Sequence, residues 1–281
     1  VIVGADVFIG VSGQANSLTA DHVKSMADKS IVFALSNPTL AEAWLGATAY
    51  SIQLLFDFAG YSAMAIGLGL MIGFKFVENF NQPYVSQSIT EFWRRWHISL
   101  SLWLRDYLYL PLGGNRKGKT RTYLNLFITM VLGGLWHGAN WTFILWGAWH
   151  GLWLAIERVL GAKNAQSVWP RFAAWPLTMV LVIIGWVIFR AESVSQALDM
   201  FAGMFGFNGF ALSEAMAWQI QSSELVFLTF GALLSTQGSW MLALFSRAPE
   251  TLRYSSVACL FFAACLALVG QNHSPFLYFQ F

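Results

Sequence analysis

Long apolar stretches separated by short polar loops fill the chain from Leu40 to its end. A helix needs about 20 mainly apolar residues to cross the hydrocarbon core of a bilayer. Stretches that approach or exceed this length lie at residues 43–73, 122–137, 139–157, 173–190, 224–246 and 254–270. The pattern predicts an all-α polytopic membrane protein with a helical bundle over residues 40–281.

The first 39 residues have a different pattern. The runs "VIVGADVFIGVS" and "IVFALSNPT" predict buried strands, and "LTADHVKSMADKS" between them predicts a short helix. Such a βαβ fragment of an α/β protein is too short to bury its own faces. We therefore expect residues 1–39 to be a short α/β fragment and not an independent domain. Its start lacks the pattern of a signal peptide.

Composition narrows the class of protein. Hydrophobic residues make up 57% of the chain and charged residues only 11%, whereas soluble domains carry about 25% charged residues. This excludes a water-soluble globule for most of the chain and predicts membrane lipid as a partner. The net charge of +2 is too small for a nucleic-acid footprint, so no nucleic acid is expected. Two cysteines, Cys259 and Cys265, make neither a disulfide framework nor a four-ligand zinc site, and no metal is expected.

Basic residues indicate the orientation of one segment. They cluster at residues 116–121 and again at 158–171, so both loops are expected to face the cytoplasm. The stretch between them must then enter the membrane and return. Its "GGLWHGANW" run weakens a continuous helix, and broken helices at membrane depth occur only against protein or a water-filled cavity. This predicts a re-entrant or broken helix with His137 at a polar hollow. A single long tilted helix is the alternative, and it would place the two basic loops on opposite sides.

Polar residues inside the first apolar stretch form a stripe. Gln53, Asp57 and Tyr61 are spaced four apart, so they share one face of a helix. The stripe is either a hydrogen-bonded seam between helices or the lining of a substrate tunnel. The sequence leaves both interpretations open.

An amphipathic segment follows, "SITEFWRRWHISLSLWLRDYLYLPLGGNR", which starts with a capping box from Ser88 to Glu91. On a continuous helix one face is polar and the other aromatic and aliphatic, which is typical of an interfacial anchor. His97 lies on the polar face beside tryptophans, where burial and nearby guanidinium groups can tune its protonation. The polar face comprises Arg94, His97, Ser101 and Arg105.

Two further histidines lie in the run "GGLWHGANWTFILWGAWHG". Glycines on both sides of His137 leave space for a substrate, which favours a functional role. His150 would lie nearly opposite on an unbroken helix, so we expect the two not to act as a pair and His150 to be structural. The chain has no G-x-S-x-G elbow, H-E-x-x-H helix or Walker loop. Histidine acid–base chemistry inside a membrane remains.

Three runs carry a resemblance: "YSIQLLFDFAGYSAMAIGLGLMIGFKFVENFNQPY", "SITEFWRRWHISLSLWLRDYLYLPLGGNR" and "GGLWHGANWTFILWGAWHG". They resemble the membrane-bound O-acyltransferase family, most closely its bacterial branch that acts on alginate and lipoteichoic acid. The resemblance covers residues 40–281 and is most specific from Tyr50 to Gly151. Full members of the family begin with additional membrane helices that this chain is expected to lack.

The resemblance implies residue roles and partners. His137 matches the histidine regarded as catalytic, and His97 matches its upstream companion. The implied reaction moves an acyl group, such as acetyl from acetyl coenzyme A, to hydroxyls of an exported bacterial polysaccharide such as alginate. It implies a multi-pass protein of the bacterial inner membrane, other polysaccharide-acetylation proteins as partners and no cofactor. His137 would accept the hydroxyl proton. Roles in orienting its ring, sheltering an oxyanion or binding substrate stay open for Asp57, Gln53, Tyr61, Trp136, Asn140 and His97.

The N-terminal runs "GADVFIGVS" and "VKSMADKSIVFALSNPT" resemble part of the nicotinamide-binding domain of malic enzyme. The resemblance implies that Asn37 corresponds to an asparagine near the cofactor. The phosphate loop, metal ligands and catalytic residues of that enzyme lie outside this stretch, so no working dehydrogenase is expected. Two alternatives to a membrane acyltransferase therefore stay open. One is a transporter or channel for an acyl donor or polymer, and the other is an inactive fusion carrying the malic-enzyme remnant.

Overall fold

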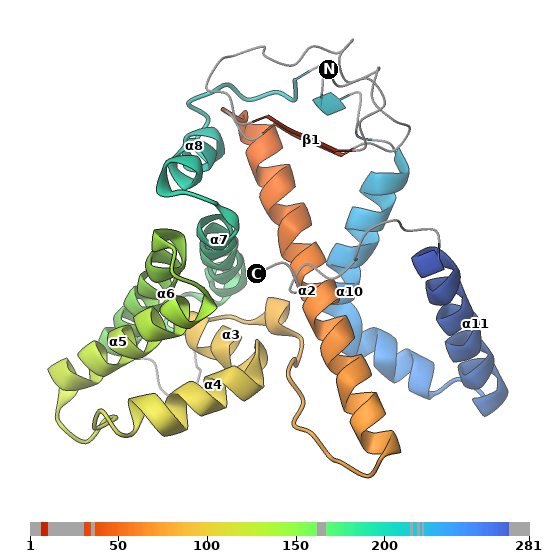
Figure 1. Ribbon diagram of the computed structural model, residues 1–281, viewed down its shortest axis with the longest axis horizontal. Helices are drawn as coiled ribbons and strands as arrows, with labels where there is room; N and C mark the ends of the chain where they lie inside the picture. Colours follow the sequence, from red (N-terminus) through yellow and green to blue (C-terminus); the bar gives the residue numbers. More distant parts are fainter. Residues whose placement is uncertain are drawn as a thin grey trace. The chain divides into compact units, whose positions relative to one another are not determined.

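The structure is a computed structural model that describes residues 7–10, 31–34, 37–161, 167–213, 216–217, 220 and 222–269. All six predicted apolar stretches coincide with helices, so the expected helical membrane architecture is confirmed (Figure 1). The elements are β1 (Val7–Gly10), β2 (Ile31–Ala34), α2 (Leu40–Met71), η1 (Pro83–Val85), α3 (Ile89–Arg95), α4 (Ile98–Leu104), η2 (Arg105–Tyr109), α5 (Lys119–His137), α6 (Trp141–Val159), α7 (Arg171–Arg190), α8 (Val194–Met204), α10 (Ser222–Ser246) and α11 (Glu250–Val269).

Within the described part of the chain, three helices are long and apolar enough to cross a membrane: α2, α7 and α10. Helices α5 and α6 have 19 residues each. Their tryptophans, histidines and other polar residues lower their hydropathy.

The chain divides into two compact units, and each is described by itself. Unit 1 contains residues 1–51, 126–155 and 180–228, and unit 2 contains residues 52–125, 156–179 and 229–281. His137 therefore belongs to unit 1 and His97 to unit 2.

Two short strands are described in the N-terminal segment. β1 and β2 pair in parallel, with Val7 opposite Ile31. The helix expected between them, over residues 18–30, lies outside the described residues. The α/β fragment and its resemblance to malic enzyme therefore stay predictions.

Helix α2 begins at a reciprocal capping pair in unit 1. The Thr39 backbone N–H donates to Glu42 Oε2 at 3.0 Å, and the Glu42 N–H donates to Thr39 Oγ1 at 3.4 Å. This satisfies N–H groups that the first turn of a helix cannot pair internally. One turn later the Trp44 indole N–H donates to the Met204 carbonyl at 3.0 Å. The start of α2 is thus tied to the end of α8, around a small core of Ala43, Ala47, Val187 and Met204.

Helices α5 and α6 form a tight antiparallel hairpin (Figure 1). The chain leaves α5 at His137 and enters α6 at Trp141, so the broken-helix prediction is confirmed and the single tilted helix is wrong. A Cβ added at Gly134 would lie 2.1 Å from the Phe143 carbonyl oxygen, and one at Gly147 would lie 2.3 Å from that of Met130. Only glycine allows the two backbones to approach this closely.

The amphipathic segment is not one helix, and this corrects the prediction of a continuous polar face. α3 ends at Arg95, α4 begins at Ile98, and His97 between them has left-handed backbone angles, φ 44° and ψ 55°. The capping box at the start of α3 is confirmed, since the Glu91 N–H donates to Ser88 Oγ at 3.0 Å. The break arises because α4 has its own cap, supplied by a distant loop described below. A turn of π-helix, η2, then ends the segment.

Candidate functional site

His137 ends α5 in unit 1, and aromatic rings position it. Its ring centroid lies 5.2 Å from those of Trp146 and Phe189, with both rings edge-on, and 5.0 Å from that of Trp136. The side chain is half-buried. Packing of this kind restricts the orientation of an imidazole while leaving part of it accessible. The polar hollow expected at His137 stays a prediction.

The glycines beside His137 have a different use from the one predicted. Cβ atoms added at Gly134 and Gly138 would meet Phe143, through its carbonyl oxygen at 2.1 Å and its ring at 2.7 Å. The space around these glycines is thus filled by α6. They explain the close hairpin and give no independent evidence for a substrate.

His150 is fully buried on α6, and its ring centroid lies 5.2 Å from that of Trp146. The helix break removes the premise that the two histidines lie on one helix. In the hairpin both rings contact Trp146, which is only 2% exposed. A Cβ at Gly185 would approach His150 Nε2 to 2.8 Å, so α7 packs closely over this ring. These contacts fit the expected structural role of His150.

Two other predicted residues lie at the hairpin turn. Asn140 uses its amide on the backbone: Nδ2 donates to the Glu192 carbonyl at 2.9 Å, and Oδ1 accepts the Thr142 N–H at 3.2 Å. It thereby caps α6 and joins the α6 start to the α7–α8 loop. Trp136 is 61% exposed, and its ring packs edge-on with that of His137. A substrate role for either residue stays a prediction.

In unit 2, His97 and part of the predicted polar stripe meet at one ring. The Phe58 ring stacks on Tyr61 at 5.1 Å and packs edge-on against His97 at 4.7 Å between centroids. Asp57 is half-buried on α2, and Gln53 is exposed. The structure thus brings Tyr61 to the same side chain as His97. Whether the stripe lines a tunnel or a helix seam stays a prediction.

A loop residue that the sequence did not single out holds His97. Asn79 Oδ1 lies 3.1 Å from His97 Nδ1 and accepts hydrogen bonds from the Ser99 N–H at 3.2 Å and the Ser99 hydroxyl at 2.9 Å. The residue lies in an extended polar stretch, "KFVENFNQPY", which carries no motif that predicts such contacts. Asn79 and His97 are 18 residues apart in the sequence, so no local pattern shows that they meet.

Glu157 is the second residue that sequence reasoning missed. Its carboxylate, 1% exposed near the end of α6, accepts hydrogen bonds from the Ile89 and Thr90 N–H groups at 2.6 and 2.9 Å and from Thr90 Oγ1 at 2.7 Å. It therefore caps α3, the helix that leads to His97. A single acid among apolar residues is a usable signal, but the neighbouring Arg158 made it resemble an ordinary charged helix end.

The arginines of this segment pair with nearby acids. Arg95 contacts Glu91 at 2.7 Å, one turn earlier on α3, and Arg105 contacts Asp106 at 2.7 Å. The hydrogen bond from Arg105 holds the pKa of the Asp106 carboxyl below its usual range. Arg94 is exposed. These positions suit a charged surface, and the interfacial-anchor interpretation stays a prediction.

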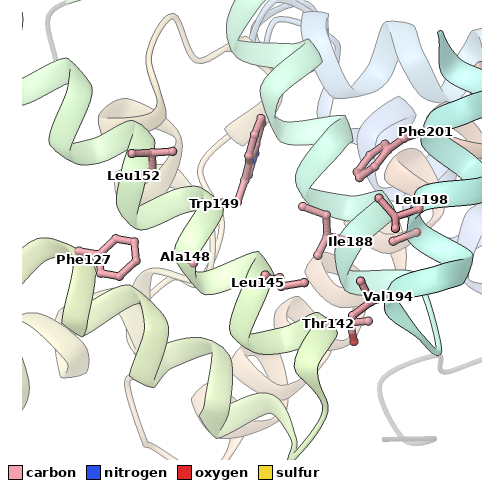
Figure 2. A pocket seen from close by; sticks show the side chains of 11 residues that line it. Phe127, Thr142, Leu145, Ala148, Trp149, Leu152, Ile188, Val194, Leu198 and Phe201 are labelled. Carbon is pink, nitrogen blue, oxygen red and sulfur yellow. The ribbon is translucent and has the colours of Figure 1, made fainter.

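A cavity of about 350 Å³ lies in unit 1 beside the hairpin (Figure 2). Its wall is apolar apart from Thr142, and Figure 2 shows it between α6 on one side and α7 and α8 on the other. It contains none of the predicted catalytic or substrate-binding residues. The lining residues are Phe127, Thr142, Leu145, Ala148, Trp149, Leu152, Ile188, Val194, Ala197, Leu198 and Phe201.

Within the described ranges, no group of three or more His, Cys, Asp or Glu side chains is close enough to hold a metal ion. A proton-exchanging role for His137 and His97 stays a prediction. His137 is held by rings, and His97 by an amide and a ring.

Comparison with known proteins identifies the family. Residues 18–195 match the model of MBOAT, the membrane-bound O-acyltransferase family. The chain is 52% identical to the probable alginate O-acetylase AlgI of Pseudomonas putida, over 93% of this chain and 58% of that protein. It is 44% identical to the peptidoglycan O-acetyltransferase of Helicobacter pylori, over 61% of this chain and 33% of that protein. A teichoic acid D-alanyltransferase of Bacillus subtilis is 34% identical over 48% of this chain and 36% of its own length.

The extent of these matches defines what they show. The chain spans about three-fifths of the length of the alginate O-acetylases it matches. The family match begins at residue 18, within the segment that resembles malic enzyme, so the domain boundary at residue 40 stays a prediction. The match covers more than half of the chain, and the chain therefore belongs to the membrane-bound O-acyltransferase family.

Proposed function

We propose that the protein of which this chain is part transfers an acyl group, most simply acetyl, to hydroxyls of an exported bacterial polysaccharide. The names of the similar proteins support this: alginate O-acetylase at about half identity over 93% of the chain, and peptidoglycan O-acetyltransferase at 44% over a shorter stretch. Each of these names joins acetyl transfer to a polysaccharide, alginate or peptidoglycan. We propose alginate or a related uronate polymer as the acceptor.

The position of His137 carries the chemical part of the proposal. It ends a helix at a hairpin turn, half-buried, with its ring held by Trp146 and Phe189. An imidazole held in this way can take the proton of a hydroxyl whose oxygen attacks the acyl carbonyl. The new C–O bond forms, the bond from the carbonyl carbon to the donor's sulfur breaks, and the proton on the imidazole passes to the leaving thiolate. No cofactor or metal is needed for this transfer.

The setting of the reaction is also proposed. We place the protein in the bacterial inner membrane as a multi-pass protein, with the thioester donor, such as acetyl coenzyme A, arriving from the cytoplasmic side and the polymer from the other. Three long apolar helices support membrane insertion. The antiparallel hairpin supports a shared side for the two basic loops, because it brings the start of α5 and the end of α6 together. Other polysaccharide-acetylation proteins are proposed partners.

The test is acyl transfer in membrane vesicles with radiolabelled acetyl coenzyme A and an alginate oligosaccharide. His137→Gln keeps a polar side chain of similar size but cannot accept the proton, so transfer should fall by about 10²- to 10⁴-fold. His150→Asn is the matched control: it should lower thermal stability, while the rate for each folded molecule stays near that of the unaltered protein. Unchanged transfer by His137→Gln would overturn the assignment of His137.

A further inference from the structure

Asn79 is the point where a loop in unit 2 closes onto the start of α4. Its backbone carbonyl accepts the Ile98 N–H at 2.9 Å, and its side-chain Oδ1 accepts the Ser99 N–H at 3.2 Å. These N–H groups belong to the first turn of α4, which has no partner for them within the helix. The residue that would ordinarily cap this helix is His97, and its side chain makes no capping bond. Asn79 takes over that function from a distance.

The same contacts fix the orientation of the Asn79 amide. The backbone N–H of Ser99 can only donate, so the side-chain atom facing it must be the oxygen. A flipped amide would direct an NH₂ group at that N–H. The contact of the amide nitrogen agrees with this orientation, because Asn79 Nδ2 donates to Ser62 Oγ at 3.2 Å. Orientation is thus set by the hydrogen-bond network, as such assignments require.

The orientation of the amide determines where His97 carries its proton. Asn79 Oδ1, 3.1 Å from His97 Nδ1, has no hydrogen to donate. A hydrogen bond between these two atoms therefore requires the proton on Nδ1. Ser99 Oγ lies 3.4 Å from the same nitrogen, but its hydrogen goes to Asn79 Oδ1 at 2.9 Å, so it too can only accept there. In a neutral imidazole the other nitrogen, Nε2, then carries the lone pair.

We propose that Asn79 is a positioning residue that holds His97 in the Nδ1–H form, so that Nε2 is a hydrogen-bond acceptor while His137 takes the hydroxyl proton. This rests on the proposed acyl-transfer function. It also bears on one role that the sequence left open for His97, that of sheltering an oxyanion. A neutral His97 in this form accepts a hydrogen bond or proton at Nε2, and it does not donate one from Nε2 to an oxyanion. Phe58, edge-on at 4.7 Å, restricts the ring's tilt.

The first test reads the proton position directly. Nitrogen NMR of the full chain labelled with ¹⁵N-histidine, in lipid nanodiscs, distinguishes protonated from unprotonated ring nitrogens, and His97→Gln assigns the signal. We expect the Nδ1–H form in the unaltered protein and a shift toward Nε2–H in Asn79→Ala. Asn81→Ala, an exposed residue of the same loop, is the control and should leave the signal unchanged. An Nε2–H form in the unaltered protein, or no change in Asn79→Ala, would overturn the proposal.

The second test uses the acid limb of the pH–rate profile. Asn79→Asp keeps an acceptor at Nδ1 and adds a negative charge, which favours the protonated ring and raises the pKa of His97. Since Nε2 must be unprotonated to accept, the acid limb should move to higher pH, with most of the maximal rate retained. Asn79→Ala should lower kcat about tenfold or more with the donor KM unchanged, because His97 is kept but its Nε2 acceptor is no longer held in one form.

The two proposals fail in different ways. If the unaltered protein transfers no acyl group, the proposed function fails, while the NMR signal still decides the form of His97. If it transfers acyl groups and Asn79→Asp leaves the acid limb in place, the inference about Asn79 fails alone. Asn79→Asp also serves if Asn79→Ala does not fold.

Discussion

The two predicted catalytic histidines are positioned by different forces. His137, in unit 1, lies among aromatic rings at centroid distances of 5.0 to 6.2 Å on a hairpin closed by glycines. His97, in unit 2, is held by the Asn79 amide at 3.1 Å, on a segment whose helices are capped from outside. Ring packing around His137 and the amide contact at His97 are thus two ways of holding an imidazole.

This difference has chemical consequences. Ring packing fixes where an imidazole lies but places little demand on which nitrogen bears the proton. A hydrogen bond to an oxygen acceptor fixes the proton as well.

The largest expected loss of stability comes from removing Trp146, whose ring packs against that of His137. Trp146→Ala deletes a side chain only 2% exposed that contacts both His137 and His150. Loss of a buried tryptophan costs about 3–5 kcal/mol in unfolding free energy. Equilibrium unfolding in mild detergent measures it. Trp136→Ala, at an exposed position of the same cluster, should change stability by less than about 1 kcal/mol. Equal losses of stability in the two variants would show that the packing around His137 does not depend on Trp146.

A smaller loss of stability is expected in unit 2, where hydrogen bonds from Glu157 cap α3. Glu157→Ala leaves the Ile89 and Thr90 N–H groups without their acceptor. A buried donor that loses its partner costs about 1–3 kcal/mol, so about 2–3 kcal/mol is expected for this variant. Amide hydrogen exchange at residues 89–97 should accelerate before the rest of unit 2 opens. Glu192→Ala, an exposed acid, is the control and should stay within about 0.5 kcal/mol. Protection unchanged at Ile89 would contradict the capping role.

Elements governed by local periodicity were predictable from the sequence. Every apolar stretch became a helix, and the glycines of "GGLWHGANW" correctly indicated a break between α5 and α6. The Ser88 capping box was also correct, because it is a local hydrogen-bond pattern. Such features depend on neighbours within a few residues, which a single sequence displays.

Features that depend on distant partners were missed. The break at His97 follows from Asn79, 18 residues earlier, and the cap on α3 from Glu157, 68 residues later than Ile89. The sequence contains both residues but not their proximity. The glycines beside His137 show the reverse case: their presence was noted, but only the structure shows that α6 fills the space they leave.

The smallest expected change in stability tests the close approach of α6 to α5. Gly147→Ala would place a Cβ 2.3 Å from the Met130 carbonyl oxygen and 3.0 Å from the Val131 Cα, both backbone atoms that cannot turn aside. The hairpin must therefore open slightly, at a cost of about 1–2 kcal/mol. Gly60→Ala on α2 is the matched control, because nothing lies within 4 Å of its added Cβ. Alanine is the better helix former by about 1 kcal/mol, so Gly60→Ala should be neutral or stabilising. Opposite signs for the two glycines would attribute the close approach of α5 and α6 to backbone contact, and equal signs would contradict it.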